Sequence, residues 1–143
     1  MIAYLDSSVL LRVVLGEPGR LGEWPRLTGG VSSALAEVEC LRTLDRLVLQ
    51  GVLDAADAVE RRAAIYALLE AVELVELSAG VLARAAQPFP VPLGTLDALH
   101  LATALLWRER GEPALAFATH DIALGQAARA SGFLVLGDTV PVR

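Results

Sequence analysis

Carboxylates stand at the points where apolar, strand-like runs give way to helical segments. Five acids occupy such junctions: Asp6, Glu37, Glu39, Asp97 and Asp121. Any one of them alone is explained as a helix cap, or as a charge that suits the positive end of a helix dipole. Several carboxylates at one edge of a sheet, however, would repel one another and would need compensation to stay ionised. A divalent cation is the simplest compensation.

Oxygen ligands favour Mg²⁺ or Mn²⁺, and the 2 His and 1 Cys of the chain form no cluster that would favour zinc. An ion that is held by a few carboxylates and keeps some of its waters is the usual arrangement for handling phosphates. One such ion activates water, and a second can stabilise the leaving oxygen. The acids therefore predict metal-assisted hydrolysis of a phosphodiester.

The elements that would position these acids alternate between strands and helices. Strands are expected at residues 2–5, 30–33, 72–77, 114–118 and 133–136. Helices are expected at residues 8–15, 35–50, 54–71, 78–87, 95–110 and 122–131, with an extended proline-rich loop at 88–94. The expected N-caps are Ser7 or Ser8, Asp54 and Thr95.

This alternation predicts one α/β domain over residues 1–143, with a central, mainly parallel sheet and helices on both faces. The strand segments are continuous apolar runs, as expected for parallel strands buried on both sides. Ligands of such open sheets bind beyond the carboxyl ends of the strands. The junction acids would stand at that edge.

Composition excludes several classes of protein. The net charge of −5 does not suit a protein that coats nucleic acid through bulk charge. All 12 of the Lys and Arg residues are Arg, which excludes Walker-type phosphate loops and Schiff-base enzymes. The single cysteine, Cys40, can form no internal disulfide, and this is typical of a reducing cytoplasm. We expect no signal peptide and no membrane segment, because a basic leader and an uncharged apolar run of about 18 residues are both missing.

Four segments carry a resemblance to a known family: YLDSSVL (4–10), SSALAEVECLR (32–42), LDALHLATAL (96–105) and THDIALGQAA (119–128). In this order they resemble the PIN-domain ribonucleases, in particular the toxin subunit of VapBC-type toxin–antitoxin pairs. The resemblance covers nearly the whole chain. It implies a three-layer α/β/α sandwich in which a catalytic Mg²⁺ or Mn²⁺ site is formed by Asp6, Glu39, Asp97 and Asp121. It also implies an RNA substrate, a homodimer and a small cognate antitoxin that blocks the site.

Glu37 and Glu39 compete for one place in this site. Two residues apart, their side chains lie about 200° apart around a helix, so both cannot point to the same place. Periodicity does not choose between them, because both flank the apolar stripe of the helix. The resemblance of AEVECLR to the family pattern selects Glu39 and leaves Glu37 as a surface acid near the helix N-terminus.

Other polar residues are secondary candidates. Ser8 and Thr119 would support the acids or position a water, and Arg12 and Arg42 would meet phosphates or the antitoxin. Arginines on solvated helix faces, however, are common without any special role. His100 lies three residues after Asp97 on the same side of a helix, where a general base is conceivable but a satisfied, partly buried histidine is more common. His120 is expected in a loop. A contact with the substrate is one interpretation, but a loop residue without such a contact is favoured.

Two apolar helical stretches and Trp24 have competing explanations. The stretches VLLRVVL (9–15) and LVLQGVL (47–53) fit either packing inside the fold or a groove for an antitoxin helix, and the small size of the chain favours the groove. Trp24 could stack on a base, but covering the core is favoured. Two alternatives to the toxin remain open: an RNA-processing nuclease of the same family and an inactive protein-binding module.

Overall fold

A single parallel sheet forms the centre of the molecule. Within residues 1–137, which the computed structural model describes, five strands lie in the order β3-β2-β1-β4-β5, and each neighbouring pair is parallel. The strands are β1 (Ile2–Leu5), β2 (Gly29–Ser33), β3 (Glu73–Val75), β4 (Ala116–Ala118) and β5 (Val135–Leu136). The predicted α/β class with a central parallel sheet is confirmed.

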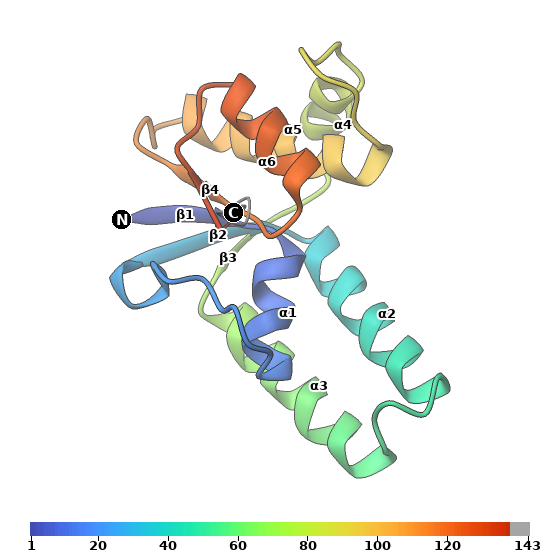
Figure 1. Cartoon of the computed structure of the whole chain (residues 1–143). Helices are drawn as coiled ribbons and strands as arrows, with labels where there is room; N and C mark the ends of the chain where they lie inside the picture. The colour runs from blue at the N-terminus through green and yellow to red at the C-terminus, as the bar shows by residue number, and fades with distance from the viewer. Residues whose placement is uncertain (138–143) are drawn as a thin grey trace, which may run out of the picture.

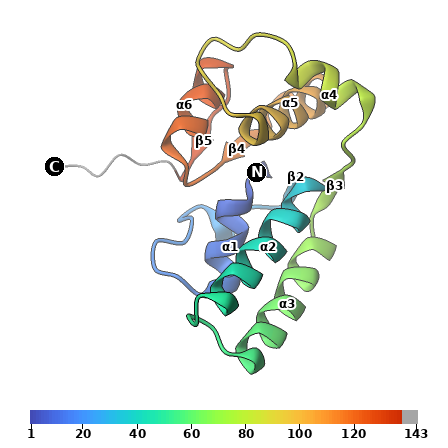
Figure 2. The same ribbon diagram turned by 90° about the vertical axis from the view of Figure 1, so that its right-hand side faces the viewer.

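Helices cover both faces of this sheet, as Figures 1 and 2 show. On one face lie α1 (Ser7–Leu15), α2 (Leu35–Leu49) and α3 (Ala55–Glu70), and on the other lie α4 (Ala79–Ala85), α5 (Thr95–Glu109) and α6 (Ile122–Ala130). The helices α2 and α3 form a hairpin that extends away from the sheet (Figure 1). This is the expected three-layer α/β/α arrangement. Among residues 1–137, no helix has the length and apolar character needed to cross a membrane.

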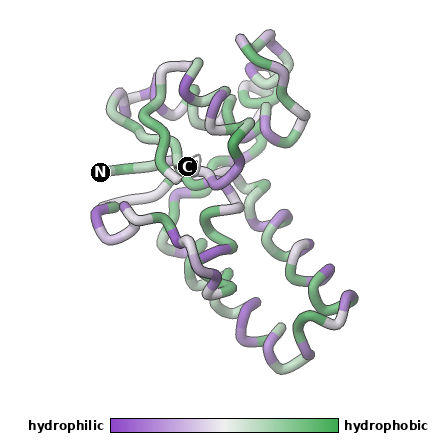
Figure 3. Tube along the Cα trace, in the orientation of Figure 1, coloured by the Kyte–Doolittle hydropathy of each residue, from purple (hydrophilic) through white to green (hydrophobic). Residues whose placement is uncertain are grey.

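The central strand β1 sends its side chains alternately to the two helical layers. Ala3 and Leu5 belong to the core beneath α1, α2 and α3, whereas Tyr4 belongs to the core beneath α5 and α6. All three side chains are buried, and β1 is coloured as hydrophobic in Figure 3. The same alternation directs Asp6, two residues after Tyr4, toward the α5 layer.

The strands β2 and β3 are added on one side of β1, and β4 and β5 are added on the other side. The direction in which the chain adds strands to the sheet therefore reverses between β1 and β4. Leu5 pairs with Ala118 at the carboxyl ends of these strands, and the Asp6 amide donates to the Ala118 carbonyl at 3.1 Å. Asp6 and Thr119 therefore leave the sheet side by side. Such a switch point is the place where open α/β sheets bind ligands.

Two of the predicted helix caps are wrong. Asp6, rather than a serine, precedes α1, and its carboxylate makes no capping bond. The Ser8 hydroxyl is committed elsewhere, because it donates to the Asp6 carboxylate at 2.8 Å. Gly94, rather than Thr95, precedes α5. The cap at Asp54 is confirmed, since its carboxylate accepts from the amide of the third residue of α3.

The last three strands are shorter than the apolar runs predicted. The edge strand β3 pairs only at residues 73–75. A turn closed by the Leu115 amide on the Glu112 carbonyl, at 3.0 Å, delays the start of β4. The Phe133 amide bonds to the Ala128 carbonyl at 3.1 Å, so this residue completes the end of α6 before β5 can begin.

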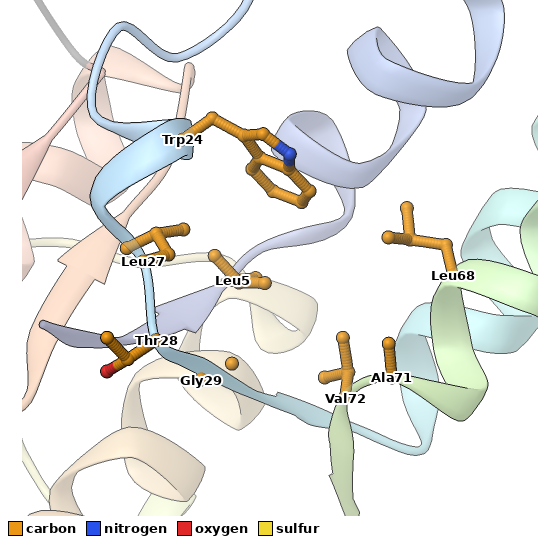
Figure 4. A pocket seen from close by; sticks show the side chains of 9 residues that line it. Leu5, Trp24, Leu27, Thr28, Gly29, Leu68, Ala71 and Val72 are labelled. Atoms are coloured by element: carbon orange, nitrogen blue, oxygen red, sulfur yellow. The ribbon is translucent and has the colours of Figure 1, made fainter.

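A hollow of about 200 Å³ lies beside Trp24, between the sheet and α3 (Figure 4). Apolar side chains of Leu5, Leu68 and Val72 line it. Gly30 in β2 allows the close packing there, because a Cβ at this position would lie 2.6 Å from the Cδ1 atom of Leu5. Trp24 is half-buried and packs against the core, which confirms the favoured prediction that it covers the core.

The apolar helix α1 packs between the sheet and the α2–α3 hairpin. Its Val9, Leu10 and Val14 side chains are buried. Packing inside the fold thus explains these three residues, whereas Leu11 and Leu15 of the same stretch line an open groove, so a docking surface for an antitoxin helix stays a prediction. The second stretch differs, since Leu49 is 79% exposed and Val52 is 65% exposed at the tip of the hairpin.

The packing of α2 against the core predicts that two leucines of this helix contribute very differently to the free energy of unfolding. Leu44 is 1% exposed, so Leu44→Ala should lower the free energy of unfolding by about 2–5 kcal/mol, the range for truncation of a core leucine. Leu49→Ala should change it by less than about 0.5 kcal/mol, as is usual at exposed positions. Urea unfolding of both variants checks this, and equal losses would contradict the packing of α2.

Candidate active site

Asp6 is a buried carboxylate whose oxygens are held by hydroxyl groups. It follows the last residue of β1 and is 5% exposed. Its Oδ2 atom accepts from the Ser8 hydroxyl at 2.8 Å and from the Thr119 hydroxyl at 2.9 Å. Its Oδ1 atom lies 3.4 Å from the Ser7 hydroxyl. The rotamer of Asp6 is therefore set by side chains from α1 and from the loop after β4.

The loop after β4 is tied to the start of α1 by a short chain of hydrogen bonds. The Ser8 hydroxyl accepts from the His120 amide at 3.0 Å, and the Thr119 hydroxyl accepts from the Asp121 amide at 3.0 Å. Asp121 then caps α6, because its Oδ1 atom accepts from the Leu124 amide at 3.0 Å. Ser8 and Thr119 thus link Asp6 to the loop that carries Asp121, and their roles as secondary site residues stay a prediction.

Glu39 reaches the same edge from α2. Its Oε1 atom lies 2.5 Å from the Nε2 atom of His100, and the same nitrogen lies 3.7 Å from Oδ1 of Asp6. Glu37 takes a different direction and lines a surface pocket with Tyr66 of α3. The structure therefore places Glu39, rather than Glu37, beside Asp6.

Asp97 joins the acids from the first turn of α5. Burial raises the pKa of its carboxyl, and the negative charges of Asp121 and Asp6, followed by that of Glu39, raise it further. His100 acts in the opposite sense on this pKa but does not outweigh them. The charges of three acids from other segments thus act on the Asp97 carboxyl at the carboxyl edge of the sheet.

These acids fit a divalent cation by their chemistry. Within residues 1–137, no three side chains of Asp, Glu, His or Cys already surround a common point as metal ligands would. The donors are nonetheless the hard oxygens that Mg²⁺ and Mn²⁺ prefer. After burial, the charges of the other acids raise the pKa of Asp97, an effect that a bound cation would offset. The four acids are the residues that could hold the ion.

A groove of about 390 Å³ continues from the acids between α1 and α2. Its lining includes Ser8, Arg12, Thr43, His120 and Asp121, with Glu17 just beyond the end of α1. The Arg12 guanidinium donates to the Gly19 carbonyl at 3.0 Å, which holds its charge over the groove. The predicted Arg42 is different, because it is exposed and pairs with Asp45 at 3.1 Å.

Two residues of this site were not predicted in their observed roles. His100 links Glu39 to the Tyr4 hydroxyl, which lies 2.6 Å from its Nδ1 atom. The signal for Tyr4 was its place in a buried strand, where a hydroxyl needs a partner, two residues before Asp6 and on the same face. Cys40, next to Glu39, takes no part in acid–base chemistry at neutral pH, because burial raises the pKa of its thiol to about 12.

The comparisons with known proteins agree with this fold. The model of the PIN domain matches residues 3–129, so the chain belongs to the PIN-domain family. It is similar to ribonuclease VapC46 of Mycobacterium tuberculosis (strain ATCC 25618 / H37Rv), with 34% identity over 136 residues. That match covers 93% of this chain and 95% of the relative.

A solved structure supports the architecture. The crystal structure of VapBC2 from Rickettsia felis, bound to a DNA fragment from their promoter, superposes with a TM-score of 0.66. The match covers 94% of this chain and 97% of that chain at 12% sequence identity. The likeness at this low identity is one of fold.

The repulsion around Asp97 predicts that its charge destabilises the metal-free fold. A pKa raised by folding means that ionisation favours the unfolded chain, and the penalty is complete above the folded pKa. Asp97→Asn should therefore raise the Tm at pH 7.5 in EDTA, by about 2–4 °C for each kcal/mol recovered. The gain in Tm should shrink as the pH falls through the pKa of Asp97. The wild-type carboxyl is then protonated and carries no charge, like the amide of the variant.

Thermal melts of wild type and Asp97→Asn from pH 4 to pH 8 make this measurement. Glu60→Gln, an exposed acid of α3, removes the same charge far from the acid edge and should leave Tm nearly unchanged. A loss of stability in Asp97→Asn at pH 7.5 would contradict the proposed crowding of negative charge.

Proposed function

We propose that this protein is a divalent-metal-dependent endoribonuclease that acts as the toxin of a toxin–antitoxin pair. The convergence of Asp6, Glu39, Asp97 and Asp121 at the switch point carries the proposal. The Nε2 atom of His100 lies within 3.7 Å of both Asp6 and Glu39. Burial and, after it, the charges of the other three acids raise the pKa of Asp97. The similarity to a VapC ribonuclease supports the same reading. Carboxylates assembled against their own repulsion are difficult to explain as helix caps alone.

In this proposal, Mg²⁺ or Mn²⁺ supplies an activated water and stabilises negative charge on the phosphate. Asp6 is the most firmly held acid, since two hydroxyls bond to one of its oxygens. Asp97 and Asp121 approach from α5 and from the start of α6. These two acids belong to the helical layer on the opposite face of the sheet from α2, which carries Glu39. A bound ion would therefore be held by acids from both helical layers.

The groove beside Asp121 suits the path of an RNA strand. It begins at the acids and passes Arg12, the cation that could meet a backbone phosphate. The protein as a whole carries a net charge of −5, so affinity for RNA would depend on such local contacts. Arg42 has a weaker claim, because it is paired with Asp45.

The proposal includes partners. A small cognate antitoxin would block the acids, and the toxin itself would form a homodimer in the cytoplasm, as the family resemblance implies. The fold that this chain shares with the VapBC2 structure supports an antitoxin partner here. The exposed apolar tip around Leu49 and Val52 is a surface available to a partner.

Substitution of Asp6 tests the nuclease. Asp6→Asn keeps the size of the side chain but removes its charge, so cleavage of single-stranded RNA in Mg²⁺ or Mn²⁺ should fall at least about 100-fold. This exceeds the 10–100-fold loss typical of residues that only support a metal ligand. EDTA should abolish cleavage by wild type, and Glu60→Gln should cut at the wild-type rate. Wild-type activity in Asp6→Asn would overturn the assignment.

Expression in cells tests the toxin role separately. Production of the wild-type chain alone should arrest growth, whereas Asp97→Asn should not, because an acid of the proposed site is lost. Coexpression of the small protein encoded beside this gene should restore growth. Unimpaired growth on production of a chain that cuts RNA in vitro would point to an RNA-processing nuclease instead.

A further inference from the structure

His100 sits at the buried junction between the two helical layers and the central strand. Its side chain is 1% exposed. The Nδ1 atom lies 2.6 Å from the Tyr4 hydroxyl of β1, and the Nε2 atom lies 2.5 Å from Oε1 of Glu39 in α2. Both ring nitrogens are therefore engaged, one by the sheet and the other by an acid of the site.

The surroundings fix the orientation of the imidazole ring. Tyr4 packs edge-on against His100, with ring centroids 5.8 Å apart, and stacks on Phe117 of β4 at 5.1 Å. His100 itself lies on the buried face of α5. Rotation of the His100 ring would break its hydrogen bond to Tyr4. Its Nε2 atom therefore stays directed at the carboxylates.

The proton on Nε2 follows from the same contacts. With the Tyr4 hydroxyl donating to Nδ1, a neutral imidazole carries its hydrogen on Nε2 and donates it to Glu39. A fully protonated ring also donates from Nε2. The other neutral tautomer would turn a lone pair toward two carboxylates, Glu39 and Asp6, and is disfavoured by repulsion.

Glu39 depends on this contact for its position. Its side chain is long, 23% exposed and attached to α2, on the opposite side of the sheet from α5. Among residues 1–137, His100 provides the side-chain hydrogen bond to its carboxylate. Because His100 also lies 3.7 Å from Asp6, one imidazole sets the relative placement of two acids that come from different elements.

We propose that His100 is a positioning residue that, braced by Tyr4, holds Glu39 against Asp6 and so prearranges the metal site. The inference rests on the proposed function, since it concerns the same acids. One oxygen of Glu39 is occupied by the imidazole, and the other is left to a cation. Groups that orient metal-binding carboxylates in this way typically contribute 10–100-fold to metal affinity.

Binding of Mn²⁺ alone to the metal-free protein tests the inference without reference to activity. Titrations followed by electron paramagnetic resonance give the affinity of wild type and of variants. His100→Leu should bind Mn²⁺ about 10–100-fold more weakly. His100→Gln should recover most of this loss, because its amide nitrogen can donate to Glu39 from nearly the position of Nε2. A role of His100 in packing alone would not be rescued by glutamine.

Two further variants make the comparison decisive. Thr103→Val lies one turn further along α5 and removes a buried hydroxyl that bonds the Leu99 carbonyl at 2.7 Å, so it should bind Mn²⁺ like wild type. Tyr4→Phe keeps the ring but frees Nδ1 of His100, and should weaken binding by about 2–10-fold, the equivalent of one hydrogen bond. If His100→Leu does not fold, Tyr4→Phe decides, and wild-type affinity in that variant overturns the inference.

The outcomes separate this inference from the proposed function. Wild type that binds no Mn²⁺ and cuts no RNA would overturn both. Wild type that binds Mn²⁺ and cuts RNA, together with unchanged Mn²⁺ affinity in folded His100→Leu, would overturn the role of His100 alone. Weak binding in His100→Leu with recovery in His100→Gln supports both.

Discussion

Electrostatic repulsion among carboxylates is the constraint on which the rest of the structure depends. The order of the strands places the ends of β1 and β4 side by side, and α2 and α5 bring further acids to the same edge. Burial of Asp97, followed by the negative charges of its neighbours, raises the pKa of its carboxyl. A buried core on both sides of the sheet holds the segments together against that repulsion.

The acids differ in the hydrogen bonds that hold them. Asp6 is enclosed by hydroxyls, and Glu39 is bonded to His100, whose pKa is lowered by burial but raised overall by Glu39, Asp6 and Asp97. Asp97 has the least help and carries the raised pKa. Asp6, Glu39 and Asp121, which caps α6, are thus each held by hydrogen bonds before any ion arrives.

Much of this could be predicted from the sequence, because doubly buried strands appear as apolar runs and acids at their ends mark the ligand edge. Local spacing could not choose between Glu37 and Glu39, since both flank the apolar stripe of α2. The link from Tyr4 to His100 spans 96 positions and depends on tertiary packing. The predicted cap at Ser7 or Ser8 was wrong for a local reason, because α1 already begins at Ser7 and the Ser8 hydroxyl bonds to the Asp6 carboxylate two residues before it. The single domain over residues 1–143 stays a prediction.

The α2–α3 hairpin has a consequence for which parts of the molecule can change. Its base carries Glu39 and is anchored by buried residues such as Leu44, whereas its tip carries Leu49 and Val52 in open solvent (Figure 1). Substitutions at the tip alter the outer surface without disturbing the packing at the base. The outer surface of the hairpin can therefore change in shape and polarity while the acids at the edge of the sheet keep their positions.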